Sequence, residues 1–214
     1  MAERRPIATR NTAWAAALAR RVAATGLTAN MISTLGLVIA LAGGWQLASF
    51  ADAAGHWRWS LFLGALCIQL RLLCNMLDGM VAVLHGRATA LGALYNDVPD
   101  RMADVALLVG AGLALGEDAH GPALGAAAAM AALLTAYVRV LGGSLGTKQH
   151  FFGPQSKSQR MAVLTGATLL GALGPDRASA KWLLLAALVI ILTGSLLTSI
   201  LRLRAIAGEL RGRG

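Results

Sequence analysis

The sequence predicts an all-α polytopic membrane protein with six transmembrane helices and a short N-terminal interfacial helix. Of its 214 residues, 57% are hydrophobic and only 14% are charged, whereas soluble domains carry about 25% charged residues. Apolar runs of roughly 20 residues, long enough to cross a bilayer, recur along the chain. Because lipid offers no hydrogen-bond partners to the backbone, such runs are predicted to be helices.

The predicted elements follow in chain order within a single domain, residues 1–214. Residues 1–30 form a cytoplasmic arm, whose segment Thr12–Ala24 places Trp14 and Leu18 on one side and arginines near them. This pattern favours an interfacial helix, and an unstructured arm is the alternative. A six-helix bundle occupies residues 31–203, and a cytoplasmic tail occupies 204–214. The six spans are predicted at Met31–Phe50, Trp59–Leu84, Pro99–Gly116, Pro122–Leu145, Ser158–Gly174 and Lys181–Leu203.

The net charge of +9 is explained by membrane topology rather than by nucleic-acid binding. With six spans, both termini and the loop from His85 to Asp97 lie on the side that holds most Lys and Arg residues, and the other side holds only Arg58, Arg177 and Lys181. The positive-inside rule makes the richer side cytoplasmic. We therefore expect a multi-pass protein of the inner (cytoplasmic) membrane that contacts membrane lipids, with its polar cluster facing the cytoplasm.

The polar cluster begins on the second predicted span. Asn75, Asp78, Gly79 and Ala82 are spaced i, i+3, i+4 and i+7, so they share one helical face. The two small residues leave room for a ligand beside the acid. An acid at the centre of a membrane helix costs at least ~2.5–3.5 kcal/mol, and for that reason it usually marks a site.

The third predicted span continues the cluster. Asn96, Asp100 and Asp104 are spaced by four residues, and Gly92 is expected in the preceding loop, where a ligand or a tight turn would favour glycine. If the two faces meet, Asn75, Asp78, Asn96 and Asp100 form one oxygen-lined cavity. Oxygen ligands of this kind suit Mg²⁺, Mn²⁺ or Ca²⁺.

These two segments resemble the signature of the CDP-alcohol phosphotransferases. That signature is D-x-x-D-G-x-x-A-R followed, after a short gap, by G-x-x-x-D-x-x-x-D. The matching positions are Asn75, Asp78, Gly79, Ala82, Gly92, Asn96 and Asp100. The stretch from Gly26 to Asn30 also resembles the L-T-P-N segment before the family's first span. Size, span number and motif position agree with the resemblance.

Three positions depart from the signature. Asn75 and Asn96 stand where the family has aspartates, and Val83 stands where it has arginine. The chain is therefore more similar to an Asn-bearing branch with an N-x-x-D-G and L-x-N-[ED]-x-x-D pattern. Two negative charges are missing, so the expected metal content is one or two ions.

The resemblance implies an enzyme of phospholipid biosynthesis and a homodimer. It would transfer a phosphatidyl-type group from a CDP-linked lipid, such as CDP-diacylglycerol, to a small alcohol acceptor with release of CMP. Mg²⁺ or Mn²⁺ would be held by Asn75, Asp78, Asn96 and Asp100, with Asp100 as catalytic base. The nucleotide would contact Asp78, Gly79, Ala82 and Gly92.

Two further acids have open roles. Asp97 is either an additional metal ligand or the N-cap of a helix that starts at Pro99. Asp104 is either a ligand or the partner of Arg71, Arg101 or Arg139. Cationic residues follow in the sequence, and we expect Arg139, Lys157 and Arg160 to bind the acceptor or a phosphate. The alternative for Lys157 and Arg160 is positive-inside topology together with contact to lipid phosphate. The alternative for Arg139 is a structural pair with a buried acid.

Two rival functions remain. Asn96-Asp97-x-x-Asp100-x-x-x-Asp104 also resembles the first acidic motif of UbiA-type prenyltransferases, but no second such motif follows in the sequence. A transport or non-catalytic membrane protein with a divalent-cation site is the other alternative, although no inverted repeat, typical of many transporters, is visible.

Overall fold

The computed structural model describes residues 12–53, 55–84, 90–117 and 120–213 of the chain. Within these ranges the long elements are all α-helices, and no strand is present. The helices are α1 (Ala13–Ala24), α2 (Ala29–Ser49), α3 (Trp57–Leu84), α4 (Ala90–Leu115), α5 (Gly121–Ser144), α6 (Lys157–Leu173) and α7 (Arg177–Arg211). The predicted all-helical class is confirmed. The first eleven residues of the expected N-terminal arm lie outside the described residues.

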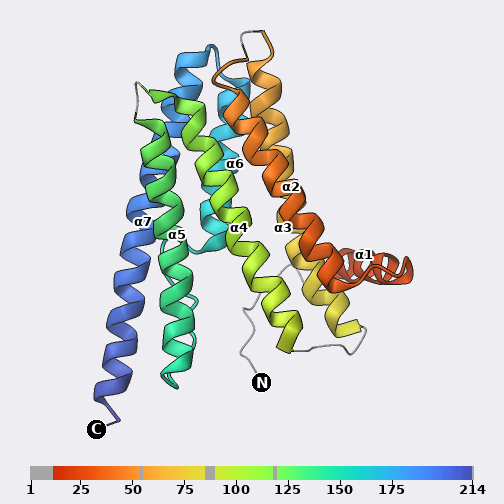
Figure 1. The fold of residues 1–214 in the computed structure, drawn as a ribbon, viewed down its shortest axis with the longest axis vertical. Coiled ribbons are helices and arrows are strands. Elements are labelled where there is room, and N and C mark those ends of the chain that lie inside the picture. The colour runs from red at the N-terminus through yellow and green to blue at the C-terminus, as the bar shows by residue number, and fades with distance from the viewer. Residues whose placement is uncertain (1–11, 54, 85–89, 118–119, 214) are drawn as a thin grey trace.

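The six long helices pack in a closed ring (Figure 1). In ring order, α2 contacts α4, α4 contacts α5, α5 contacts α7, α7 contacts α6, α6 contacts α3, and α3 returns to α2. The short helix α1 packs against α3 and lies across the direction of the bundle, at the end where α7 also finishes. Helices that are distant in sequence, such as α3 and α6, are thereby brought together.

Local sequence explains where several helices begin. The Thr28 hydroxyl caps α2 by accepting a hydrogen bond from the Met31 amide. Ser156 and Gln159 form a capping box at the start of α6, and the Asp176 carboxylate caps α7 by accepting from the Ser179 amide at 2.7 Å. Side-chain oxygens of this kind satisfy the amides that have no partner in the first turn. The Ser179 amide and hydroxyl lower the pKa of Asp176.

The N-terminal boundary of α4 differs from the prediction. We predicted a helix that begins at Pro99, but α4 begins at Ala90 and contains Pro99 in its interior. Proline removes only one backbone hydrogen bond, and helices in membrane proteins tolerate it. Asp97 therefore lies inside the helix and is not its N-cap. Gly92 lies in the first turn of α4 instead of a loop, and residues 85–89 of the expected loop lie outside the described residues.

Small residues let the helices approach closely around a core that includes Leu107, Leu108 and Leu164. At the α2–α4 crossing, a Cβ atom added at Gly110 would lie 2.2 Å from the carbonyl oxygen of Gly44. The backbones are therefore in direct contact, as small residues allow in membrane helices.

Replacing Gly110 with alanine should destabilise the bundle. The added methyl group must push α2 and α4 apart, and overpacking of this kind costs ~1–3 kcal/mol. The midpoint of thermal unfolding in detergent measures the effect. Gly166→Ala, in α6, is the matched control because its Cβ would meet no heavy atom within 4 Å. Equal midpoints for the two variants would contradict close packing at this crossing.

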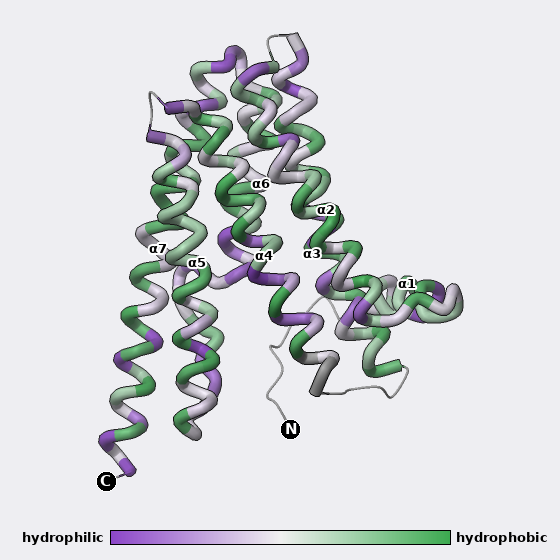
Figure 2. Tube along the Cα trace, in the orientation of Figure 1, coloured by the Kyte–Doolittle hydropathy of each residue, from purple (hydrophilic) through white to green (hydrophobic). Residues whose placement is uncertain are grey.

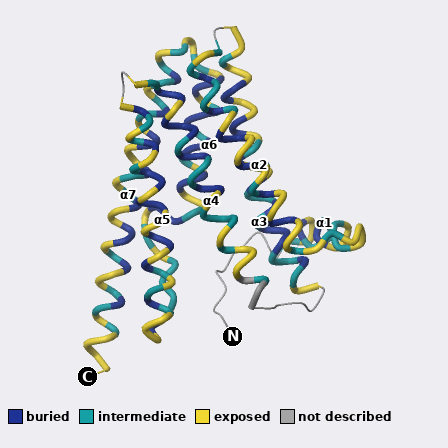
Figure 3. Tube along the Cα trace, in the orientation of Figure 1, coloured by how far each residue is buried: buried dark blue, intermediate teal, exposed yellow. Residues whose placement is uncertain are grey.

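The surface of the bundle has the character of a membrane protein. Large apolar side chains are exposed on the outer faces of the helices, among them Trp45, Met130, Leu170 and Trp182. Figure 2 shows mainly hydrophobic helices with hydrophilic residues in the lower half of α4 and near the helix ends, and Figure 3 shows buried residues on the inner sides of the helices. Four helices, α2, α3, α5 and α7, are long and apolar enough to cross a membrane.

The two remaining long helices do not reach that standard by length and composition. α4 carries Asp97, Asp100, Arg101 and Asp104 within 26 residues, and α6 has only 17 residues, about 26 Å at 1.5 Å per residue. The predicted membrane fold is thus supported, with four candidate spans among the described helices.

Candidate functional site

A small pocket lies between α2, α3 and α4, and it contains three of the predicted site residues. Asn75 and Asp78 reach it from α3, and Asp100 reaches it from α4. The remaining lining residues are Ser33, Gly36, Leu37, Arg71, Cys74, Pro99 and Ala103. The helical spacing predicts that the polar faces of two successive segments meet, and Asp78 and Asp100 line the same pocket.

Asp78 is the most deeply buried acid that faces the pocket. Only 3% of the residue is exposed. Its Oδ2 atom accepts a hydrogen bond from the Ser33 hydroxyl at 2.8 Å, while Oδ1 accepts none from the described residues. A buried carboxylate oxygen without a hydrogen bond is costly, and a cation in the pocket would satisfy it.

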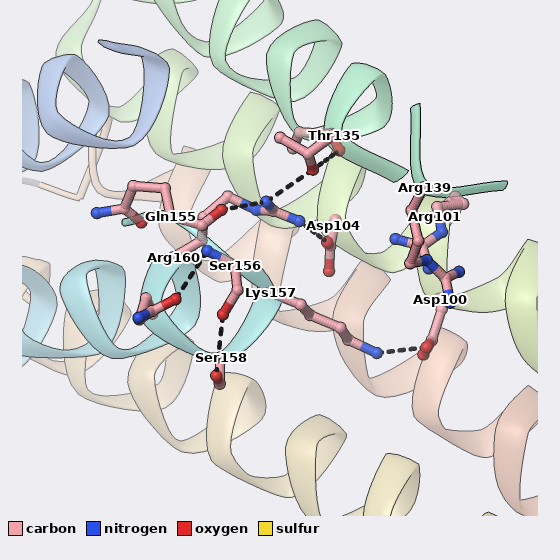
Figure 4. Close-up of polar contacts among 12 residues, drawn as sticks. Asp100, Arg101, Asp104, Thr135, Arg139, Gln155, Ser156, Lys157, Ser158 and Arg160 are labelled. Atoms are coloured by element: carbon pink, nitrogen blue, oxygen red, sulfur yellow. Dashed lines mark hydrogen bonds and ion pairs between the residues drawn. The ribbon is translucent and has the colours of Figure 1, made fainter. Parts of the chain in front are cut away.

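Asp100 is held by donors from two other helices. The Asn75 Nδ2 atom lies 3.0 Å from each carboxylate oxygen of Asp100, and the Lys157 ammonium group, at the start of α6, contacts Oδ2. Arg71 adds its Nη2 atom 3.5 Å from Oδ1 and donates to the Asp100 carbonyl oxygen at 2.9 Å. Figure 4 shows Lys157 extending from its helix toward Asp100.

Beneath the pocket, Asp104 forms the centre of a buried ion-pair network. Its Oδ1 atom lies 2.7 Å from Arg71 Nη2, and its Oδ2 atom lies 3.1 Å from Arg160 Nη2. Both arginines are 1% exposed and Asp104 is 2% exposed. Arg160 also donates to the Thr135 hydroxyl and to the Gln155 carbonyl oxygen (Figure 4). Of the roles left open for Asp104, the structure therefore favours the pairing with Arg71.

A second acidic residue is paired closer to the surface. Asp97 Oδ1 accepts from Arg101 at 2.9 Å and from Arg139 at 3.1 Å, and 46% of the Asp97 side chain is exposed. Arg139 also donates to the Gln149 side chain. Asp97 is thus engaged by two arginines and does not line the pocket.

The other predicted site residues do not line the pocket. Asn96 is exposed on α4, one turn before Asp100. Gly79 and Ala82 are partly buried on the last turns of α3, and Gly92 is partly buried in the first turn of α4. Arg160 has its hydrogen bonds inside the protein, so its contacts support a role in packing more directly than one in acceptor binding.

Sequence reasoning did not identify Ser33 or the role of Arg71 in the pocket. Ser33 lies on α2, and no spacing within one helix relates it to Asp78. The position of Arg71 could have been predicted to be functional, because a charged residue inside an apolar span usually marks a site. It lies one turn before Asn75 on the same face of α3, where it contacts both Asp100 and Asp104.

The donor set fits a divalent cation beside Asp78. Asp78 Oδ1 and the Asn75 carboxamide oxygen are hard ligands of the type that Mg²⁺ and Mn²⁺ prefer. The part of the chain that the structure describes contains no group of three or more His, Cys, Asp or Glu residues suited to a metal. The site is therefore poorer in carboxylates than a signature with four aspartates.

No family model matches the chain, and its similarity to known proteins comes from one sequence match and from solved structures. The chain is 29% identical over 125 residues to archaetidylinositol phosphate synthase from Methanothermobacter thermautotrophicus. The match covers 58% of this chain and 62% of the relative, so the chain spans less than two thirds of that relative's length.

Solved structures share the fold. The phosphatidylinositol phosphate synthase of Mycobacterium tuberculosis with CDP-DAG bound superposes with a TM-score of 0.72 at 20% identity, over 90% of this chain and 92% of that one. The same enzyme in complex with manganese and citrate has a TM-score of 0.72, over 90% of this chain and 88% of that one. Its apo form has a TM-score of 0.61 at 22% identity, over 85% of this chain and 94% of that one.

The fold and the pocket define a helical membrane protein with an oxygen-lined site between neighbouring helices. The sequence relative and the shared fold bear out the resemblance of this chain to the CDP-alcohol phosphotransferase superfamily.

Proposed function

We propose that this protein is a divalent-metal-dependent CDP-alcohol phosphotransferase of phospholipid biosynthesis. It transfers a phosphatidyl-type group from a CDP-linked lipid, such as CDP-diacylglycerol, to a small alcohol acceptor. The observation that carries the proposal is the pocket in which Asn75, Asp78 and Asp100, three positions of the two-segment signature, converge. The CDP-DAG and manganese bound by the enzyme of the same fold support the choice of donor and metal.

Asn75, Asp78 and Asp100 each have a role in this reaction. Asp78 and Asn75 hold the cation, with Asn96 and Asp97 available from the first half of α4. A divalent cation bound there would supply positive charge to neutralise the donor diphosphate. Asp100 accepts the proton of the acceptor hydroxyl, the hydroxyl oxygen forms a bond to the lipid-linked phosphorus, and the bond from that phosphorus to CMP breaks, so that CMP leaves with the electron pair. One Asp100 oxygen must exchange its contact with Asn75 or Lys157 for the acceptor.

The nucleotide lies along the end of α3 in this proposal. Gly79 and Ala82 present little side chain on the face that carries Asp78, and Gly92 does so at the start of α4. The acceptor binds near Arg139 and Lys157, which are cationic and partly accessible. Arg160 supports this region from below through its contact with Asp104.

In the membrane, we propose six spans, with α4 and α6 crossing alongside the four candidates. Asp100 then faces the pocket and Asp104 faces the neighbouring helices. The Lys and Arg distribution places the site at the cytoplasmic side of the inner membrane. In this proposal the chain is a single domain, and two chains form a homodimer.

Purified protein incubated with radiolabelled CDP-diacylglycerol, Mn²⁺ or Mg²⁺ and a panel of alcohols tests the proposal. The panel includes inositol phosphate, glycerol phosphate and serine. We expect CMP release that requires the metal and one of these acceptors. Metal-dependent solute flux in proteoliposomes without CMP release would instead support the transport alternative.

Arg139→Gln should weaken acceptor binding more than it slows chemistry. Loss of the guanidinium removes a charged donor near the acceptor, so we expect a rise of about tenfold in acceptor KM with a smaller change in kcat. Steady-state kinetics with varied acceptor measures both constants. Arg58→Gln is the matched control, because Arg58 binds the carbonyl oxygens of Gly174 and Pro175 away from the pocket. An unchanged KM in Arg139→Gln would remove Arg139 from the acceptor site.

A further inference from the structure

We infer that the pocket holds one divalent cation per chain, bound at Asp78, and that the Lys157 ammonium group occupies the position of a second cation at Asp100. This inference rests on the proposed function and settles the number of ions at its site. Three features of the described residues carry it: the donors around Asp100, the charge balance of the buried groups, and the contacts of Asp78.

The first feature is that Asp100 already has its donors. Asn75 Nδ2 lies 3.0 Å from both carboxylate oxygens, Lys157 Nζ contacts Oδ2, and Arg71 Nη2 lies 3.5 Å from Oδ1. In the signature with four aspartates, position 75 would carry an acid that repels Asp100 unless a cation lay between them. Here the amide donates to Asp100 directly, and a second cation would have to displace the lysine.

The second feature is the balance of charge. Two acids, Asp100 and Asp104, are joined to three bases, Arg71, Lys157 and Arg160, in one connected set of ion pairs. Asp78, which lines the same pocket, takes part in no ion pair among the described residues and makes the number of acids equal to the number of bases. One divalent cation adds two positive charges, which the diphosphate of the donor offsets. A second ion would lie about 4 Å away, as in two-metal sites. The pocket has no further carboxylate that would balance the positive charge of that ion.

The third feature places the single ion. Ser33 holds one oxygen of Asp78 at 2.8 Å, which fixes the carboxylate, and the other oxygen has no hydrogen bond from the described residues. Asp78 is therefore oriented and has one ligand atom free for a cation. Lys157 donates to Asp100 and, among the described contacts, not to Asp78, so Asp78 Oδ1 is left to the ion.

Manganese binding to the purified protein in detergent tests the inference without any turnover. Titration with Mn²⁺ in the presence of CDP, followed by electron paramagnetic resonance and calorimetry, should give one ion per chain and the spectrum of an isolated Mn²⁺. Asp78→Ala should bind none. Two ions per wild-type chain with a coupled spectrum, or retention of the ion in Asp78→Ala, would overturn the inference.

A pair of variants tests the part played by the lysine. Asn75→Asp combined with Lys157→Gln restores an acid and removes the ammonium group, so binding should rise from one to two ions per chain with a coupled spectrum. Asn75→Asp combined with Lys157→Arg keeps the positive charge and should still bind one. If both double variants bind one ion, Lys157 does not stand in for a cation.

These outcomes are independent of the proposed reaction. One ion per chain without CMP release from any donor and acceptor would overturn the proposed function and leave the ion count intact. Two ions per chain with normal turnover would overturn the ion count and leave the proposed function intact.

Discussion

Replacing Asp78 with alanine is expected to reduce kcat/KM for phosphatidyl transfer by about a thousandfold, or ~4 kcal/mol of transition-state stabilisation. The variant loses the one buried carboxylate oxygen in the pocket that has no hydrogen bond from the described protein. Without it, the cation is not held beside the donor diphosphate. CMP release under saturating Mn²⁺ is the measurement, with membrane insertion verified by yield and gel filtration.

The matched control is Asp52→Ala, because Asp52 is an exposed aspartate in the connection between α2 and α3. It should leave kcat/KM unchanged. Ser33→Ala provides an intermediate case, since it removes only the hydrogen bond that orients Asp78. We expect a loss of about tenfold there, the usual scale for one oriented hydrogen bond to a charged group. Near-normal activity in Asp78→Ala would remove Asp78 from the catalytic site.

Replacing Asp104 with leucine is expected to lower the free energy of unfolding by ~3–5 kcal/mol. The substitution leaves Arg71 and Arg160, each 1% exposed, as buried cations without their carboxylate partner. For a chain of this size the midpoint of thermal unfolding should fall by about 10 °C, as measured in detergent.

Two controls separate burial from pairing. Asp97→Leu breaks a similar contact with two arginines, but 46% of the Asp97 side chain is exposed, so we expect a loss below ~1 kcal/mol. Asp104→Leu combined with Arg71→Met and Arg160→Met replaces the network with apolar groups and should recover much of the stability. An unchanged midpoint in Asp104→Leu would show that the network does not support the fold.

The approximate positions of the helices were predictable from the sequence because lipid leaves the chain few alternatives. An apolar run of about 20 residues in a bilayer must satisfy its own backbone, and the helix meets that requirement. The predicted spans agree with α2, α3 and α5–α7 to within a few residues at most ends. The C-terminal end of α7 runs eight residues past the predicted Leu203. The predicted start at Pro99 is wrong for α4, because a membrane helix tolerates proline in its interior and Pro99 lies inside α4.

Helical periodicity is a local property, so the residue spacing alone predicts which oxygen-bearing side chains share a face of α3 and a face of α4. Their partners on other helices are defined by the packing of the bundle. Ser33 on α2 fixes Asp78, Lys157 on α6 contacts Asp100, and Arg160 on α6 pairs with Asp104. These contacts depend on the closed ring that brings α2 and α6 against α3, and no spacing along the chain encodes the distance between helices that are remote in sequence.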